Sequence, residues 1–237
     1  PTLAAEESPE TETMSVPLAN SKGAFSIDDY EVIEALACSK EALVLGPGIG
    51  TDAATAEVVY RLYMENDRPQ VIDADALNLL AARPEIIRRP AGPRIFTPHP
   101  GEMARMLGCT IHEVQSDRLK AAQWLTDTEG LPPMITVLKG AGTVVVANDG
   151  TFALNTSGNP GMGTGGMGDV LAGIIGGLLV QGYTPWQAAC FGVYLHGLAG
   201  DYLATKQPWG YLATEVAQAL PTVLGRFINN QRKEQLC

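Results

Sequence analysis

One stretch of the sequence combines glycines with a carboxylate in a spacing that suits chemistry on an anion. Residues 159–169 read NPGMGTGGMGD, with five glycines in eleven residues, and run into the apolar segment VLAGIIGGLLV. Glycine is the costliest residue to order, so such a cluster needs a reason. Glycines let backbone N–H groups approach an anion, and a helix start is partly positive. We therefore predict a phosphate-binding loop, although a turn needed only for close helix packing has the same sequence.

Two familiar nucleotide motifs fit this stretch poorly. Residues 161–166 match G-x-G-x-x-G, but they lie late in the chain behind an expected hairpin. No βαβ unit follows that would supply a ribose-binding acid, which argues against a dinucleotide fold. No Gly-Lys-Ser/Thr follows either, which excludes a Walker P-loop. The glycines are interpreted as an anion cradle of another kind.

Asp169 falls in the first turn of the helix expected after these glycines. A carboxylate there is often no more than favourable with the helix dipole. Beside a bound phosphate, a mere cap would repel the ligand. A base that deprotonates an attacking hydroxyl, in contrast, has to lie close to the transferring phosphoryl group. The spacing alone leaves base and cap equally open.

Two further segments place polar side chains at the ends of expected strands. Residues 97–102 read TPHPGE, where prolines stiffen the backbone around His99 and Glu102 enters the next helix. His99 either contacts a ligand or is structural. Residues 138–143 read LKGAGT and set Lys139 beside a glycine turn, where it either pairs with phosphate or is a solvated hairpin lysine.

Glycines and carboxylates recur earlier in the chain. Residues 45–50 read LGPGIG, which indicates either a close ligand approach or a tight connection from strand to helix. Residues 71–80 read VIDADALNLL, where Asp73 or Asp75 orients Mg²⁺ through water or caps the next helix. The three histidines are scattered and the cysteines unpaired in sequence, so no transition-metal site is predicted. His196, in an apolar helix, is interpreted as structural.

Short apolar runs alternate with amphipathic stretches, which is typical of an α/β protein with helices on both faces of a mainly parallel sheet. In such sheets ligands bind beyond the carboxyl ends of the strands. We expect one long helix over residues 111–129, another that starts at Thr184 and Pro185, and a last one over residues 213–227. The expected strands cover residues 42–46, 70–75, 94–98, 134–140, 143–149 and 151–155.

Composition excludes several classes of function. The chain has 237 residues, 46% apolar and only 18% charged, with a net charge of −10 and no basic stripe for nucleic acid. Its four cysteines form no C-x-x-C pair, which favours a reducing cytoplasm. The longest uncharged apolar run, residues 170–180, is too short to span a bilayer. A small-molecule substrate, and no membrane partner, is expected.

Taken together, the segments LGPGIG, VIDADALNLL, TPHPGE, LKGAGT and GGMGDVLAGII occur in the order and spacing of ADP-dependent (S)-NAD(P)H-hydrate dehydratases. The resemblance extends from about residue 40 to residue 220. It implies a ribokinase-like three-layer α/β/α fold with a mostly parallel central sheet. Residues 1–237 are then expected to form a single domain that lacks the N-terminal βα region with which the family normally begins.

The resemblance also implies an activity and a set of site residues. Family members use ADP to phosphorylate the ring hydroxyl of hydrated nicotinamide dinucleotides, NADHX or NADPHX. AMP and phosphate are released and NADH or NADPH is regenerated. Asp169 resembles the base, and Gly48, His99 and Asp169 resemble substrate contacts. The implied nucleotide contacts are Lys139, Gly140, Ala141, Gly142 and Thr143, together with Asn159, Pro160, Gly161, Met162, Gly163, Thr164, Gly165, Gly166, Met167 and Gly168.

Further properties follow from the same resemblance. It implies a cytoplasmic lyase that depends on Mg²⁺, assembles as a homotetramer and works with a fused or separate NAD(P)HX epimerase. A ribokinase-like ATP-dependent kinase of a small hydroxylated vitamin precursor shares the glycine loop and its aspartate and is the alternative. A nucleotide-binding protein without catalysis is a third interpretation, which the role of Asp169 would distinguish.

Overall fold

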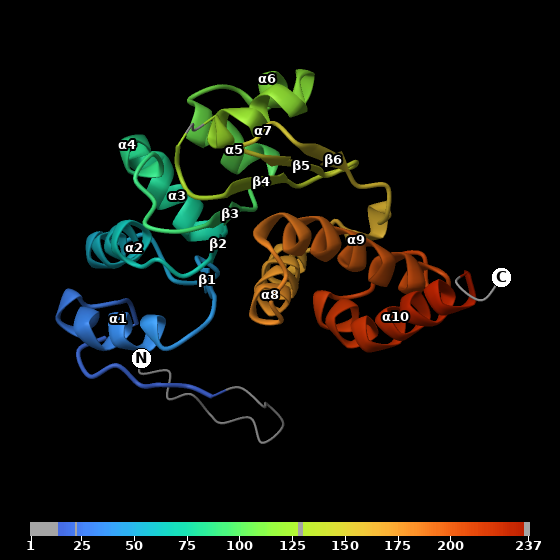
Figure 1. The fold of residues 1–237 in the computed structure, drawn as a ribbon, viewed down its shortest axis with the longest axis horizontal. Coiled ribbons are helices and arrows are strands. Elements are labelled where there is room, and N and C mark those ends of the chain that lie inside the picture. The colour runs from blue at the N-terminus through green and yellow to red at the C-terminus, as the bar shows by residue number, and fades with distance from the viewer. Residues whose placement is uncertain (1–13, 22, 128–129, 235–237) are drawn as a thin grey trace.

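A six-stranded sheet forms the centre of the protein in the computed structural model (Figure 1). The structure describes residues 14–21, 23–127 and 130–234, the last six of these by their backbone alone. The strands lie in sequence order across the sheet. They are β1 (Leu43–Leu45), β2 (Gln70–Ile72), β3 (Arg94–Phe96), β4 (Met134–Leu138), β5 (Val144–Ala147) and β6 (Phe152–Leu154).

The first four strands are parallel, and only β5 runs in the opposite direction. Val71 of β2 pairs with Val44 of β1 and with Ile95 of β3, and Ile95 pairs in turn with Ile135 of β4. β5 pairs antiparallel with both β4 and β6. The predicted mostly parallel sheet is therefore confirmed, and the carboxyl ends of β1–β4 lie at one edge.

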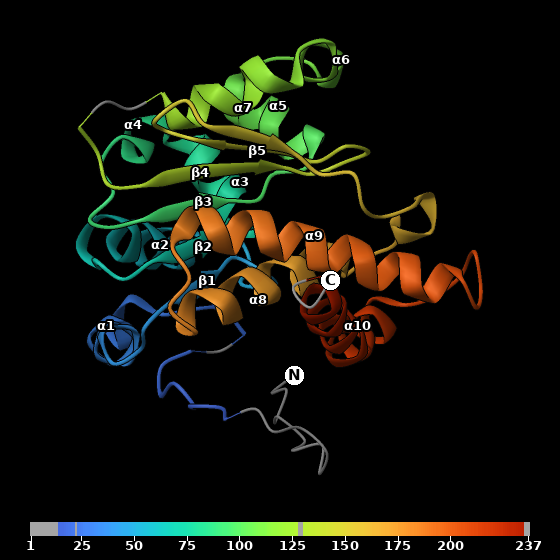
Figure 2. The same cartoon turned by 45° about the vertical axis from the view of Figure 1, so that its right-hand side comes forward.

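Helices cover both faces of this sheet because side chains alternate along each strand. Ile72 and Phe96 pack in the core under α2, α3, α5 and α7, whereas Val71 and Ile95 pack against α8 and α9. Figure 2 shows α8 and α9 on the side of the sheet opposite α3 and α7. The helices are α1 (Tyr30–Cys38), α2 (Ala53–Glu65), α3 (Ala74–Ala82), α4 (Pro84–Ile87), α5 (Pro100–Leu107), α6 (Ile111–Ser116), α7 (Arg118–Thr126), α8 (Met167–Val180), α9 (Pro185–Ala204) and α10 (Ala213–Glu234).

Two helix predictions need correction. The single helix expected over residues 111–129 is two helices, because Asp117 leaves helical geometry at φ −147° and accepts a hydrogen bond from Lys120 N to start α7. The predicted end of that helix, at residues 128–129, lies outside the described residues. The last helix, expected to end at residue 227, continues to Glu234 and packs on α8 and α9.

The sequence also predicted unpaired cysteines and no segment long enough to span a membrane. Cys38, Cys109 and Cys190 are free, and Cys237 lies outside the described residues. Over the described part of the chain, no helix is both long enough and apolar enough to cross a membrane.

Candidate active site

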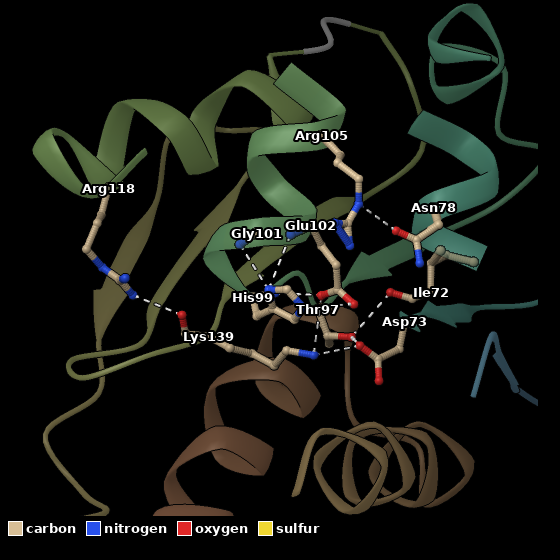
Figure 3. Close-up of polar contacts among 10 residues, drawn as sticks. All are labelled: Ile72, Asp73, Asn78, Thr97, His99, Gly101, Glu102, Arg105, Arg118 and Lys139. Carbon is tan, nitrogen blue, oxygen red and sulfur yellow. Dashed lines mark hydrogen bonds and ion pairs between the residues drawn. The ribbon is translucent and has the colours of Figure 1, made fainter. Parts of the chain in front are cut away.

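The segments predicted to carry chemistry gather at the carboxyl edge of β1–β4. The turn 46–50 follows β1, Asp73 follows β2, residues 97–99 follow β3 and Lys139 follows β4. Parallel strands end at the same edge, so segments far apart in sequence become neighbours there. Figure 3 shows several of these side chains, from Asp73 to Lys139, converging beside the start of α5. We call residues 139–143 the lysine turn and residues 158–168 the glycine loop.

Lys139 lies between two carboxylates. Its Nζ is 2.8 Å from Asp73 Oδ1 and 3.8 Å from Glu102 Oε2 (Figure 3). Thr97 Oγ1 donates to the same Asp73 oxygen at 2.7 Å, and the Asp73 side chain is only 1% exposed. A buried carboxylate must be paired, which Lys139 and Thr97 achieve. The interpretation of Lys139 as a solvated hairpin lysine is therefore wrong, and so is that of Asp73 as a helix cap, since its side chain does not cap α3.

His99 begins α5 and has a structural role as well as an open face. Its Nδ1 accepts from Gly101 N at 2.9 Å and from Glu102 N at 3.3 Å, while Glu102 Oε2 accepts from His99 N at 2.7 Å. This reciprocal pair is a capping box with histidine in place of serine or threonine. Because Nδ1 accepts hydrogen bonds, Nε2 carries the proton of the neutral ring. The side chain remains 51% exposed and so is accessible to a ligand.

The turn after β1 packs against the strand end that carries Asp73. Gly46 has φ +131°, and a methyl group there would lie 1.7 Å from the carbonyl oxygen of Asp73. The tight-connection interpretation of this turn thus holds at Gly46, whereas a methyl group on Gly48 would meet nothing within 4 Å. Asp75 Oδ2 accepts from Gly50 N at 2.9 Å and so holds the turn. Ala74, between the two aspartates, has φ +49°, a strained value that clusters at functional sites.

The glycine loop leads into α8 beside Lys139. Gly166 takes the left-handed conformation at φ +82° and begins the helix without a side-chain cap. A methyl group at Gly168 would lie 3.1 Å from Lys139 Nζ and 3.7 Å from Asp73 Oδ2. The positive end of α8 and the ammonium of Lys139 therefore face the same space, which suits an anion.

Asp169 lies in the first turn of α8 and is exposed. Among the described residues, its carboxylate forms no hydrogen bond that caps α8. Its place in the first turn is still favourable with the helix dipole, so the structure leaves both the base and the helix-dipole role open. Its catalytic role stays a prediction.

Two residues that the sequence analysis did not identify hold the glycine loop from behind. Asp201 of α9 accepts from Gly158 N at 2.8 Å and from Asn159 Nδ2 at 3.0 Å. Tyr211 donates its hydroxyl to Asn159 Oδ1 at 2.6 Å, and the same oxygen accepts from Gly161 N at 3.0 Å. The one available signal was that Asp201 is the only charged residue in the otherwise uncharged helix α9.

His196 lies beneath the junction of the two loops. Burial is the main cause that lowers its pKa to about 4, and the positive charge of Lys139 adds to this effect. A hydrogen bond to the Met167 backbone opposes the shift, and Nε2 is buried without a partner among the described residues. The ring is consequently neutral at neutral pH, which fits its interpretation as structural.

Comparison with known proteins tests the resemblance found in the sequence. A family model described as NAD(P)H-hydrate dehydratase matches residues 6–222. The chain belongs to this family. It is 42% identical over 224 residues to a bifunctional NAD(P)H-hydrate repair enzyme of Moorella thermoacetica, covering 94% of this chain and 41% of the relative. An ADP-dependent (S)-NAD(P)H-hydrate dehydratase of Neisseria meningitidis is 43% identical over 183 residues, covering 75% and 61%.

Solved structures agree with the family and the fold. An ADP/ATP-dependent NAD(P)H-hydrate dehydratase from Bacillus subtilis, co-crystallized with ATP/Mg²⁺, matches with a TM-score of 0.68 at 33% identity. The match covers 82% of this chain and 69% of that one. A ribokinase-like superfamily protein from Enterococcus faecalis matches with a TM-score of 0.70 at 28% identity, covering 86% and 69%. The predicted ribokinase-like α/β/α fold is confirmed.

Membership in the NAD(P)H-hydrate dehydratase family favours the dehydratase over the kinase that the sequence left as the alternative. The kinase of a vitamin precursor becomes the weaker alternative, because a hydroxyethylthiazole kinase from Pyrococcus horikoshii matches at only 15% identity with a TM-score of 0.59. A likeness at that level carries the fold alone. The chain spans between about two fifths and three fifths of the length of the two curated relatives described above.

Proposed function

We propose that the protein catalyses the ADP-dependent dehydration of (S)-NADHX and (S)-NADPHX to NADH and NADPH, with release of AMP and phosphate. Family membership supports this reaction. The observation that carries it is the approach of the lysine turn to the glycine loop. Lys139 Nζ lies 3.1 Å from where a methyl group on Gly168 would be, and Asp169 is the next residue. A cation, a helix start and an unpaired carboxylate suit phosphoryl transfer to a hydroxyl.

ADP is expected to bind across the two loops. The Lys139 ammonium and the positive end of α8 attract its diphosphate, since both lie at one side of the same space. Residues 139–143 and 159–168 then supply backbone contacts. Because Asp73 and Glu102 hold Lys139, its ammonium is positioned before ADP arrives, which lowers the entropy cost of binding.

Asp169 is proposed to accept the proton of the ring hydroxyl of the hydrate. The hydroxyl oxygen forms a bond to the β-phosphorus of ADP as the bond from that phosphorus to the bridging oxygen breaks, and AMP leaves. In the phosphorylated hydrate, the carbon–oxygen bond breaks and phosphate departs with the electron pair. Loss of a proton from the neighbouring ring carbon completes the double bond of NADH or NADPH.

The hydrate is expected to lie over the turn 46–50 and α5. Gly48 has open space beside it, and the half-exposed His99 ring presents Nε2–H near the site. Both features suit contact with a polar ligand at the carboxyl edge of the sheet. Glu102 contributes by fixing the orientation of His99 through the capping box.

The residues at this edge fit a Mg²⁺ ion that arrives with the nucleotide. No group of three or more His, Cys, Asp or Glu side chains gathers for a metal within the described ranges. Mg²⁺ is commonly bound by one or two carboxylates plus substrate phosphates, rather than by a cage of protein ligands. Asp73 Oδ2, which faces Gly168, and Asp169 are the carboxylates that would hold it, directly or through water. When bound, the ion neutralises charge on the phosphates.

The proposal extends to the compartment, the oligomeric state and the partner enzyme of the protein. We expect a cytoplasmic homotetramer that receives its substrate epimer from an NAD(P)HX epimerase, fused or separate. The name of the Moorella relative, a bifunctional repair enzyme, is consistent with such a coupling.

The deciding experiment supplies the purified protein with NADHX or NADPHX, ADP and Mg²⁺. We expect the near-ultraviolet absorbance of the reduced nicotinamide to return, with AMP and phosphate formed in equal amounts. A stable phosphate ester of another substrate, without reaction of the hydrate, would favour the kinase. Binding of ADP without any turnover would favour a non-catalytic nucleotide-binding protein.

A further inference from the structure

Arg118, the first residue of α7, lies directly behind the lysine turn (Figure 3). Its Nη2 donates to the carbonyl oxygen of Leu138 at 3.0 Å and to those of Lys139 and Gly142 at 3.4 Å each. Nη1 donates to Gln115 Oε1 at 2.8 Å. The guanidinium thus gathers carbonyl groups from both ends of a short turn, as a planar fork of donors can.

The charge of this guanidinium is not neutralised by a carboxylate. No ion pair joins Arg118 to an acidic side chain in the part of the chain that the structure describes. Its Nε is buried and has no hydrogen-bond partner among the residues that the structure describes, and burial lowers the pKa of the group from its ordinary value. An arginine nevertheless stays protonated in proteins. A positive charge therefore stands behind the turn, solvated by carbonyl and amide dipoles.

Because Arg118 binds carbonyl oxygens of the lysine turn, it also sets the direction of the N–H groups in the same peptide bonds. The C=O and N–H of a trans peptide point in opposite directions. The carbonyl oxygens of Lys139 and Gly142 face Arg118, so the N–H groups of Gly140 and Thr143 face away from it. Neither N–H group donates to a described residue, whereas Lys139 N donates to Pro98 O at 2.8 Å.

We propose that Arg118 is a positioning residue for the diphosphate of the nucleotide, acting through the lysine turn. It aims the N–H groups of Gly140 and Thr143 at the anion and adds an unpaired positive charge behind them. The inference rests on the proposed binding of ADP at this turn. Arg118 makes the turn competent to bind, and the diphosphate is the part of the nucleotide that depends on it.

The test compares Arg118→Gln and Arg118→Lys with Arg88→Gln. Arg88 is a matched control because its guanidinium likewise donates to backbone carbonyl oxygens, those of Trp124 and Asp127 at the other end of α7. Each variant is measured for ADP and adenosine affinity, for KM and kcat in the hydrate assay, and for melting temperature. Adenosine lacks the diphosphate and so separates recognition of phosphate from general damage to the site.

We expect Arg118→Gln to weaken ADP binding and raise KM for ADP by about tenfold or more, as for lost hydrogen bonds to a charged group. Adenosine affinity and kcat at saturating ADP should stay within about threefold of the wild type, allowing for the scatter of such effects. Arg118→Lys keeps the positive charge but loses the planar fork of donors. Its ADP affinity should lie between those of the wild type and Arg118→Gln. Arg88→Gln should match the wild type in every nucleotide measurement, even if its melting temperature falls.

Two results would overturn the inference while leaving the proposed function intact. One is ADP affinity of Arg118→Gln equal to that of Arg88→Gln, and the other is an equal loss of ADP and adenosine affinity. If Arg118→Gln does not fold, Arg118→Lys decides, and wild-type ADP affinity in that variant would count against the inference. A wild-type protein that dehydrates the hydrate without binding ADP would also refute it. Failure of the wild type to dehydrate the hydrate overturns the proposed function itself.

Discussion

The two loops that flank the site are held in opposite ways. In the lysine turn, Lys139 forms ion pairs with Asp73 and Glu102, and the Arg118 guanidinium behind it donates hydrogen bonds to backbone carbonyl oxygens. The glycine loop is held by hydrogen bonds to an aspartate and a tyrosine, Asp201 and Tyr211. The charge behind the first loop is positive, and the charge behind the second is negative.

This difference in charge indicates that the two loops contribute differently to the site. Positive charge behind the lysine turn attracts an anion, and its buried ion pair fixes the ammonium in advance. The glycine loop has no cationic side chain of its own and contributes backbone amides, the start of α8 and Asp169. Loss of a charge should therefore damage the first loop most, whereas the second should respond to loss of geometry or of its base.

Asp73→Asn should have the largest effect, because it leaves Lys139 beside a neutral amide at a buried position. We expect the free energy of unfolding to fall by about 3 kcal/mol, as for a buried pair that loses one partner. Urea denaturation measures this change. Asp75→Asn is the matched control, since among the described residues Asp75 accepts a hydrogen bond only from Gly50 N, and it should cost about 1 kcal/mol or less. Equal losses in the two variants would contradict the stabilising role assigned to the ion pair of the lysine turn.

Asp169→Asn tests the chemical contribution of the glycine loop. We expect kcat to fall by about 10²-fold or more, as for a lost general base. In the absence of Mg²⁺, ADP affinity should stay the same or rise, because a negative charge near the phosphates is removed. Hydrate turnover and calorimetric titration with ADP measure the two quantities. Glu57→Gln, an exposed change on α2, should alter neither. Unchanged turnover in Asp169→Asn would refute the proposed base.

His196 should make the junction of the loops sensitive to acid. Its folded-state pKa of about 4 lies below the ordinary value of 6.5, so the unfolded chain takes up the proton first. This contribution to stability is fully present above pH 6.5 and is lost as the pH falls toward 4. Between pH 7 and pH 5 it amounts to about 2 kcal/mol. His196→Gln should remove that part of the pH dependence in denaturation experiments, whereas His112→Gln on the surface should leave it unchanged.

Tyr211→Phe should have the smallest effect and act on the geometry of the glycine loop alone. It removes the hydroxyl that donates to Asn159 Oδ1 and should cost about 1 kcal/mol of stability. We expect KM for ADP to rise a few-fold while kcat hardly changes. Tyr60→Phe loses a comparable hydrogen bond, to Leu79 O, away from the site. It should lose similar stability with an unchanged KM, and equal KM values in the two variants would contradict the role of Tyr211.

The sequence by itself determined the fold class and the segments that form the site. Short apolar runs that alternate with amphipathic stretches, and the glycines and prolines between them, indicated the sheet and most helices. The motifs TPHPGE, LKGAGT and NPGMGTGGMGD pointed to one family, to which the chain belongs. That residues 1–237 form a single domain, and that the named residues bind ADP and the hydrate, stay predictions.

Only the tertiary structure decided which side chains act together. Asp73 and Lys139 are 66 residues apart, and Asn159 and Asp201 are 42 apart, so no local spacing reveals either contact. Arg118 was hidden inside a helix that the sequence predicted as continuous. Local patterns report propensity and burial, whereas ion pairs and loop supports depend on how strand ends and helices meet. For that reason the chemistry of the site could be named from the sequence, but its supporting residues could not.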